Sequence, residues 1–167
     1  MFNQLTQRDI DAMQKEIEER KIVIRPKLLE DVKEARAHGD LSENFEYYAA
    51  KKEKNKNESR IRFLERMIKT AELIPDDAAE DEIGMNSIVT VQFEEDGSEE
   101  TYTIVTTMRG NSLENLISVE SPIGKALMGH RAGDRVEVEV SKDYSYGLLI
   151  QKIEKDENME EHKLRDF

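Results

Sequence analysis

The segment that decides the fold is ARAHGDLSENFEYYAAK, residues 35–51. One helical pattern ends within it and another begins within it, with Gly39 between the two. Glycine caps the end of a helix well because it adopts the left-handed conformation without strain. Only a few residues then separate two helices, and such neighbours run antiparallel. The segment therefore predicts the tip of a helical hairpin, with an acidic tip near residues 39–46.

Helical repeats flank this tip on both sides. On the N-terminal side the spacing of three and four residues is kept by Ile10, Met13, Ile17, Lys21, Ile24, Leu28, Val32 and Ala35. On the C-terminal side a heptad pattern continues through Tyr47, Ala50, Lys54, Asn57, Ile61, Leu64, Ile68 and Ala71. Pro26 predicts a kink or a restart in the first arm. The repeats predict an antiparallel coiled coil with weaker pairing near Lys54 and Asn57.

The periodicity changes after Pro75. Residues 76–82 are acidic and predict a linker, and from Ile83 onward apolar and polar residues alternate as in strands. Asp96-Gly97 predicts a hairpin turn, and residues 121–129 predict one short helix. We therefore expect an α+β protein. Its parts are an α-helical hairpin at 1–75, a linker at 76–82, a small antiparallel β-sheet domain at 83–155, and a frayed or loosely helical tail at 156–167.

The composition of the 167 residues excludes several kinds of chemistry. The chain has no cysteine and only three histidines, which disfavours disulfides, thiolate metal sites, cysteine nucleophiles and a Ser/His triad. No apolar run is long enough for a membrane span and no secretory leader is visible, so we expect a cytoplasmic protein without a membrane partner. Residues 1–74 carry 16 basic and 15 acidic side chains, whereas residues 75–167 carry 9 and 22. This asymmetry indicates two modules with different partners.

Two interpretations of Asp40 and Glu43 stay open from their spacing. They fit a capping pair at the start of the second helix. They also fit a pair of hard oxygen ligands at the end of a long hairpin, which would complete a Mg²⁺ site whose other ligands belong to a partner. Behind them lies a basic stretch that either solvates the helix or contacts RNA or an acidic protein surface. Its candidate contact residues are Lys51, Lys52, Lys54, Lys56 and Arg60.

Residues 35–51 strongly resemble the tip motif of the Gre transcript-cleavage factors, most nearly the GreA branch of that family. The matching tip positions include Gly39, Leu41, Asn44 and Tyr47. The resemblance continues along the chain through Arg25-Pro26, Glu58, Arg60-Ile61, Leu64-Glu65, residues 115–119, residues 121–129 and Gly133-Asp134. Several ordered motifs over most of the chain are hard to obtain by chance.

The resemblance implies a coiled coil that enters the secondary channel of bacterial RNA polymerase and an FKBP-like C-terminal domain that docks at the channel rim. In such factors the tip carboxylates, here Asp40 and Glu43, help to hold the second catalytic Mg²⁺ and to position the attacking water. The ion is shared with the polymerase and is not bound stably by the factor alone. The polymerase then cleaves its own backtracked RNA, so the factor is not itself the enzyme. The implied partners are the polymerase and the 3′ end of the nascent RNA, and we expect a monomer.

Departures from the family pattern keep other functions open. Phe45 stands where the family has a small residue, Tyr48 stands where it often has His or Asp, and residues 54–59 also differ. One alternative is an inhibitory or regulatory member of the family, although the presence of both carboxylates favours a cleavage factor. A second is a non-catalytic coiled-coil adaptor. A third, peptidyl-prolyl isomerase activity, rests on the implied fold alone, and fold does not imply function.

Overall fold

The computed structural model describes residues 3–39, 44–77, 79–156 and 162–166. The chain divides into two compact units. Residues 8–71 form the hairpin unit, and the sheet unit contains residues 72–166 together with the first seven residues of the chain. The sequence places the first residues with the hairpin, whereas the structure groups them with the sheet. The reason is a short parallel pairing of β1 (Gln4–Leu5) with β2 (Glu72–Leu73).

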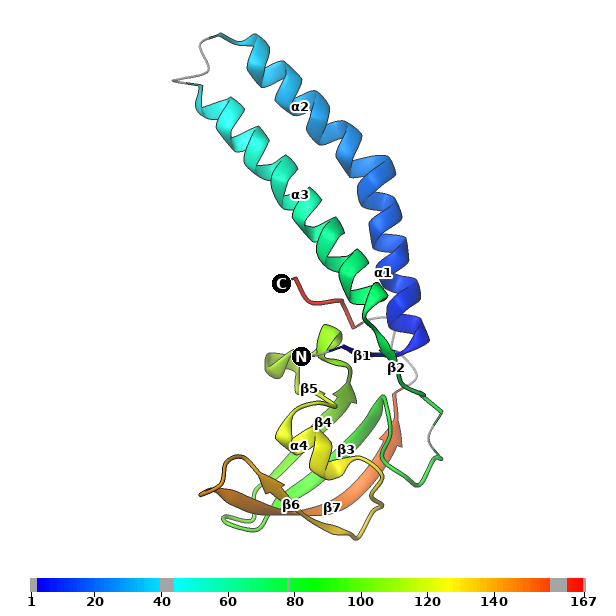
Figure 1. Ribbon diagram of the computed structural model, residues 1–167. Helices are drawn as coiled ribbons and strands as arrows, with labels where there is room; N and C mark the ends of the chain where they lie inside the picture. Colours follow the sequence, from blue (N-terminus) through cyan, green and yellow to red (C-terminus); the bar gives the residue numbers. More distant parts are fainter. Residues whose placement is uncertain (1–2, 40–43, 78, 157–161, 167) are drawn as a thin grey trace. The chain divides into compact units, whose positions relative to one another are not determined.

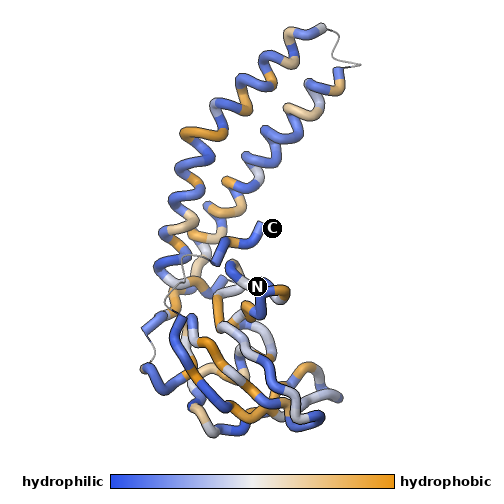
Figure 2. The backbone as a smooth tube through the Cα atoms, turned by 180° about the vertical axis from the view of Figure 1, so that it is seen from behind, coloured by the Kyte–Doolittle hydropathy of each residue, from blue (hydrophilic) through white to orange (hydrophobic). Residues whose placement is uncertain are grey.

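The hairpin predicted from the heptads is confirmed. One arm consists of α1 (Gln7–Glu19), a π-helical turn η1 (Arg20–Ile24) and α2 (Arg25–Ala37), and α3 (Phe45–Lys69) returns beside it (Figure 1). Apart from the exposed Lys21, all the repeat positions are buried or half-buried. Hydrophobic segments recur along both arms with hydrophilic ones between them (Figure 2). The apolar stripes therefore pair the two arms, as a coiled coil requires.

Pro26 changes the first arm without breaking it. Proline has no backbone N–H, and its ring crowds the carbonyl four residues earlier, so an ordinary α-helical turn cannot continue through it. The helix widens just before the proline, and the N–H of Arg25 bonds to the carbonyl oxygen of Arg20, five residues back. Ile22 and Val23, on this wide turn, are 65% and 62% exposed. The predicted kink or restart is thus a π-helical turn followed by α2.

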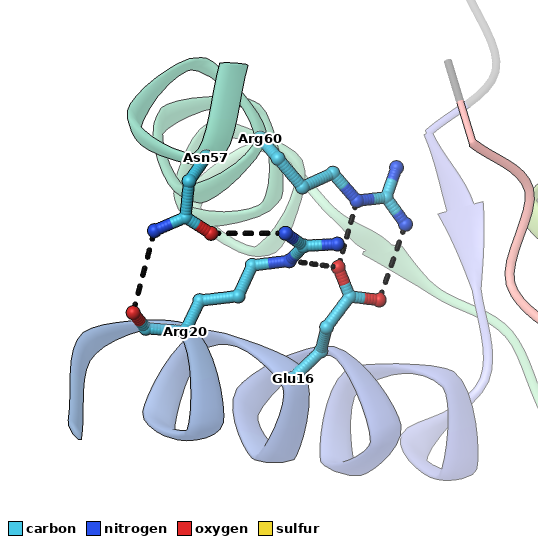
Figure 3. Close-up of polar contacts among 4 residues, drawn as sticks. All are labelled: Glu16, Arg20, Asn57 and Arg60. Atoms are coloured by element: carbon cyan, nitrogen blue, oxygen red, sulfur yellow. Dashed lines mark hydrogen bonds and ion pairs between the residues drawn. The ribbon is translucent and has the colours of Figure 1, made fainter. Parts of the chain in front are cut away.

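A polar network crosses the base half of the hairpin (Figure 3). Glu16 accepts hydrogen bonds from Arg20 (2.8 Å) and from Arg60 (2.8 and 3.2 Å). The buried amide of Asn57 accepts from Arg20 Nη1 at 2.9 Å and donates to the Arg20 carbonyl at 3.4 Å. Asn57 is expected to pack poorly at its seam position, but its polar atoms have partners. It therefore marks the register of the two arms.

The second unit is a five-stranded sheet in the order β5-β4-β3-β7-β6. Its strands are β3 (Ser87–Phe93), β4 (Glu99–Val105), β5 (Leu116–Ser118), β6 (Arg135–Glu139) and β7 (Ser145–Lys155). The sheet is mixed rather than purely antiparallel, because β5 runs parallel to β4. Two 3-10 turns, η2 (Thr107–Arg109) and η3 (Ser112–Glu114), lie between these strands and let the chain return in the same direction.

The predicted hairpin turn and short helix are both present in this unit. Gly97 lies in the turn between β3 and β4 with a positive φ of 72°. The helix α4 (Pro122–Leu127) buries Leu127 in the core of the sheet. A Cβ at Gly124 would lie 2.1 Å from the Ser118 carbonyl oxygen, so only glycine allows α4 to approach β5 this closely. The core residues include Val89, Val91, Ile104, Val136, Val138, Leu148 and Ile150.

The end of the tail is held against η2. The Arg109 guanidinium donates to the His162 carbonyl oxygen at 2.6 Å, and the Arg165 N–H donates to the Met108 carbonyl oxygen at 2.6 Å. The His162 ring also lies 2.6 Å from the Asp156 carboxylate. A frayed or loosely helical tail is therefore the wrong description of its described part. The tail thus provides an acceptor for the buried guanidinium of Arg109.

Candidate functional site

The candidate site lies at the turn between the two arms of the hairpin. Its predicted metal ligands and catalytic residues, Asp40 and Glu43, lie outside the described residues, as does Leu41 of the tip motif. The structure describes both flanks of this segment, from Gly39 backward and from Asn44 forward. Gly39 has a φ of 127°, which favours glycine, and it follows the last turn of α2 as predicted. The chain thus leaves α2 through a glycine, and four residues separate this glycine from Asn44.

Asn44 joins the two arms at this point. Its side-chain oxygen accepts the N–H of Tyr47 at 3.0 Å, which makes Asn44 the N-cap of α3. Its amide nitrogen donates to the carbonyl oxygen of Ala35 in the last turn of α2. The capping interpretation of Asp40 and Glu43 concerns residues outside those that the structure describes, and the described N-cap of α3 is Asn44.

A contact between a histidine and a carboxylate crosses the same junction. Nδ1 of His38 lies 3.0 Å from a carboxylate oxygen of Glu46, and both side chains are largely exposed. His38 caps the end of α2, and Glu46 lies in the first turn of α3. Together with Asn44, these two side chains connect the arms immediately outside the acidic segment. We refer to His38, Asn44 and Glu46 as the tip clamp.

The two tyrosines near the tip have different surroundings. Tyr47 is half-buried, and the Arg36 guanidinium lies 5.6 Å from its ring centroid. The contact from Arg36 also lowers the pKa of the Tyr47 hydroxyl. Tyr48 is 52% exposed and meets Tyr47 edge-on, and Phe45 is 85% exposed. Packing thus accounts for Tyr47, while Tyr48 and Phe45 present aromatic surface to solvent.

The five basic candidates separate into two groups. Lys51, Lys52 and Lys56 are exposed on α3, and Lys54 is half-buried. Arg60 is buried, 7% exposed, and pairs with Glu16. Because its guanidinium is engaged in the base of the hairpin, we do not group Arg60 with the surface contacts. The four lysines remain as candidate contacts on α3 near the tip.

Charged pairs further down the hairpin hold two carboxylates in the ionised form. Burial raises the pKa of Glu16, but hydrogen bonds from Arg60 and Arg20 outweigh it, and the pKa is lower than usual. Arg25 binds both oxygens of Glu58, at 2.7 and 2.8 Å, and this fork lowers the pKa of Glu58. Arg25 and Glu58 were singled out by motif alone. The structure gives them a role in joining α2 to α3.

The described residues contain no cluster of three or more His, Asp or Glu side chains able to hold a metal ion. Asp40 and Glu43 have the hard oxygen donors that suit Mg²⁺, but two carboxylates are too few for a site built by this chain alone. A shared site therefore fits the donor set better than a resident one. Within the part of the chain that the structure describes, no helix is long and apolar enough to cross a membrane.

The prediction from sequence missed two residues of the tip clamp, His38 and Glu46. In the sequence, His38 stands just before Gly39 and Glu46 stands at the end of the acidic tip, and no pattern pairs them. A cross-helix pair eight residues apart has no local periodic signal, because it depends on how the connection brings α2 and α3 together. Asn44 did carry a signal, since asparagine is among the preferred N-cap residues.

Comparison with known proteins covers both units. Residues 3–73 match the family description "Transcription elongation factor, N-terminal", and residues 78–155 match "Transcription elongation factor, GreA/GreB, C-term". The proteins named transcription elongation factor GreA in Streptococcus sanguinis strain SK36 and Streptococcus pneumoniae strain G54 are 42% and 41% identical to this chain. In each case the match covers 90% of this chain and 94% of the relative.

Among solved structures, GreA factor homolog 1 of Thermus thermophilus aligns over 90% of this chain and 97% of its own, with 25% identity and a TM-score of 0.41. The family descriptions cover both units, and the Streptococcus relatives span most of the chain. The chain therefore belongs to the GreA/GreB family of transcription elongation factors, on the GreA side of it.

Proposed function

We propose that this elongation factor binds bacterial RNA polymerase, inserts its hairpin into the secondary channel and stimulates cleavage of backtracked RNA by the polymerase. One observation carries the proposal: α2 and α3 are the arms of a long hairpin, and the sequence between them contains Asp40 and Glu43. A long hairpin with two carboxylates in its connection can deliver them to a deep site. Membership of the family supports RNA polymerase as the partner.

The roles of the tip residues follow from their chemistry. The carboxylates of Asp40 and Glu43 provide oxygen ligands that complete a Mg²⁺ site together with the polymerase and the RNA phosphate. When bound there, the ion supplies an activated water and stabilises the leaving oxygen of the RNA chain. The carboxylates also accept hydrogen bonds from the attacking water and so orient it. The catalytic centre belongs to the polymerase, and this protein provides additional metal ligands to it.

The lysines of α3 serve a separate step in this proposal. Lys51, Lys52 and Lys56 are exposed within the first half of α3, close in sequence to the tip. Their positive charge suits the phosphates of an extruded RNA 3′ end, and such contacts weaken with salt. Lys54, half-buried, contributes through its end charge. We expect the protein to act as a monomer, because one hairpin fills one channel.

A cleavage assay on stalled, backtracked polymerase complexes tests the proposal. Native protein is compared with the Asp40→Asn/Glu43→Gln variant, which keeps side-chain size and removes both charges, and binding of each to the complex is measured in parallel. Native protein should shorten the RNA, and the variant should bind but lose the stimulation by about a hundred-fold or more. Binding without cleavage by either protein would indicate an inhibitory or regulatory factor. Absence of binding by both would favour the adaptor.

A further inference from the structure

We propose that the outer face of α3 binds unpaired nucleotides of the RNA 3′ end, with Phe45 and Tyr48 stacking on bases and with Lys52 and Lys56 contacting phosphates. We refer to these four residues as the outer stripe. All four lie in the described part of α3. The inference rests on the proposed function, which brings extruded RNA to this end of the hairpin, and it adds the bases of that RNA to the phosphates as ligands.

The outer stripe follows from the helical period. Its members are spaced three or four residues apart, so their side chains lie on one face of α3, and all four are exposed. Tyr47, Ala50 and Asn57 are half-buried or buried on the opposite face, which packs against the other arm. The outer stripe therefore faces away from the seam and is accessible in the folded hairpin.

The two rings expose more aromatic surface than the packing of the hairpin uses. Phe45 is 85% exposed and Tyr48 is 52% exposed, one helical turn apart. The Tyr48 ring meets Tyr47 edge-on, with 5.6 Å between the ring centroids, and Tyr47 is itself held by Arg36. Contact with a packed neighbour limits the positions of the Tyr48 ring, which lowers the entropy lost when it binds a ligand. The pair forms a partly fixed aromatic platform.

The charge beside this platform favours nucleic acid as its ligand. Lys52 and Lys56 continue the same face toward the middle of α3. Aromatic rings bordered by cations suit a single strand, because every base has a face that stacks and the phosphates follow along the strand. An apolar protein surface would use the rings but not the lysines. The unpaired strand that the proposed function supplies is the 3′ end of the RNA.

The sharpest test changes the rings and the bases together. Phe45→Leu/Tyr48→Leu keeps apolar side chains and good helix formers but removes both aromatic faces. Polymerase complexes backtracked by several nucleotides are prepared with ordinary or with abasic nucleotides in the extruded RNA. Cleavage is measured against factor concentration and expressed relative to the same complex without factor.

The native protein should need about a ten-fold higher concentration for half-maximal stimulation when the extruded RNA is abasic. The double leucine variant should need this higher concentration with both RNAs, because the rings and the bases act on each other. The melting temperature should not change, since neither ring lies on the seam. A role of the rings in folding alone would not depend on the bases.

Further variants serve as matched controls. Leu29→Ala removes an apolar side chain that is 46% exposed on α2, and it should leave both half-maximal concentrations unchanged. Phe45→Trp offers a larger ring and should keep the difference between ordinary and abasic RNA. Lys52→Gln/Lys56→Gln should raise the half-maximal concentration with both RNAs and weaken its dependence on salt.

The outcomes separate this inference from the proposed function. Native protein that binds polymerase without stimulating cleavage contradicts both. Native stimulation with the same half-maximal concentration for native protein and the double leucine variant contradicts the inference alone. A further loss of affinity in that variant when the RNA is abasic would assign the rings to a polymerase surface. A change in its mass by light scattering would assign them to a second copy of this chain, and either result would contradict the inference.

Discussion

The base and the tip of the hairpin are built differently. In the base half, Met13, Ile61, Leu64 and Met67 are buried, and Arg60 lies buried against Glu16. At the tip, Phe45 is 85% exposed, and the cross-helix contacts include the polar ones of the tip clamp and the contact of Arg36 with Tyr47. Burial of apolar surface dominates folding stability, whereas exposed polar contacts add little. The base therefore stabilises the hairpin, and the tip is free to carry charge.

This difference has a consequence for function. Asp40 and Glu43 bring two like charges into a short connection, which a tightly packed tip would tolerate poorly. Because the stability of the hairpin resides elsewhere, the tip can keep these charges available for a partner. Changes at the base should then alter stability, and changes at the tip should alter activity. A tip variant that alters stability, or a base variant that alters activity without altering stability, would contradict this division.

The largest effect on stability is expected for Leu64→Ala. Leu64 is fully buried, and removal of its side chain should lower the free energy of unfolding by about 2–4 kcal/mol through lost burial and the resulting cavity. Leu29→Ala is the matched control, since Leu29 is 46% exposed and off the seam. Urea unfolding followed by helical circular dichroism measures both. Equal losses in the two variants would contradict the buried seam.

A smaller effect is expected for Glu16→Gln, which removes the charged partner of the buried Arg60. The loss should be about 1–2 kcal/mol, below the range for a fully buried pair, because the Glu16 side chain is still 24% exposed. Glu53→Gln, at an exposed position of α3, should leave stability unchanged. The same urea titration compares them. A neutral result for Glu16→Gln would show that the network of Figure 3 marks register without stabilising the base.

Acid should weaken the base through the same network. The pKa values of Glu16 and Glu58 are lowered in the folded chain from their usual 4.5. Their contribution to stability is therefore fully present above about pH 5 and is lost as the pH falls through the lowered values. Melting curves between neutral and acidic pH should show this loss. The loss of stability in acid should be smaller in Glu16→Gln. If this variant loses as much stability as the native protein, Glu16 does not contribute to the loss.

The smallest effect on stability is expected for Asp40→Asn/Glu43→Gln, the variant with the largest expected effect on activity. Neutralising the pair leaves the Asn44 cap of α3 in place and removes two like charges from a short connection. The melting temperature should stay the same or rise slightly. A clear fall in the melting temperature would mean that the carboxylates stabilise the fold. That result would contradict the assignment of stability to the base and of activity to the tip.

The sequence predicted the hairpin well because its seam repeats over many turns. Each apolar step reinforces the next, so the polar exceptions at Lys21, Lys54 and Asn57 did not obscure the pattern. The strands were predicted for the same reason, from alternation at positions such as Val89 and Val91. The direction of β5 was not, because a three-residue strand after two 3-10 turns carries no local sign of parallel pairing.

Polar contacts between distant residues were harder to predict. In the sequence, Asn57 looks out of place on an apolar seam, and Arg60 looks like an ordinary charged residue. The hydrogen bonds of Asn57 with Arg20 and of Arg60 with Glu16 explain both positions. The docking of His162 by Arg109 is likewise invisible before the fold is known. At the tip, spacing left both interpretations of the acidic pair open, and the described N-cap of α3 is Asn44.

The most direct test of the division between base and tip is a competition experiment. Asp40→Asn/Glu43→Gln protein is added in increasing excess to backtracked polymerase complexes that native protein is cleaving. The account predicts that cleavage slows in proportion to the share of variant in the total factor, because the variant folds and binds normally but brings no carboxylates. Cleavage that continues at the native rate under a large excess of the variant would contradict it.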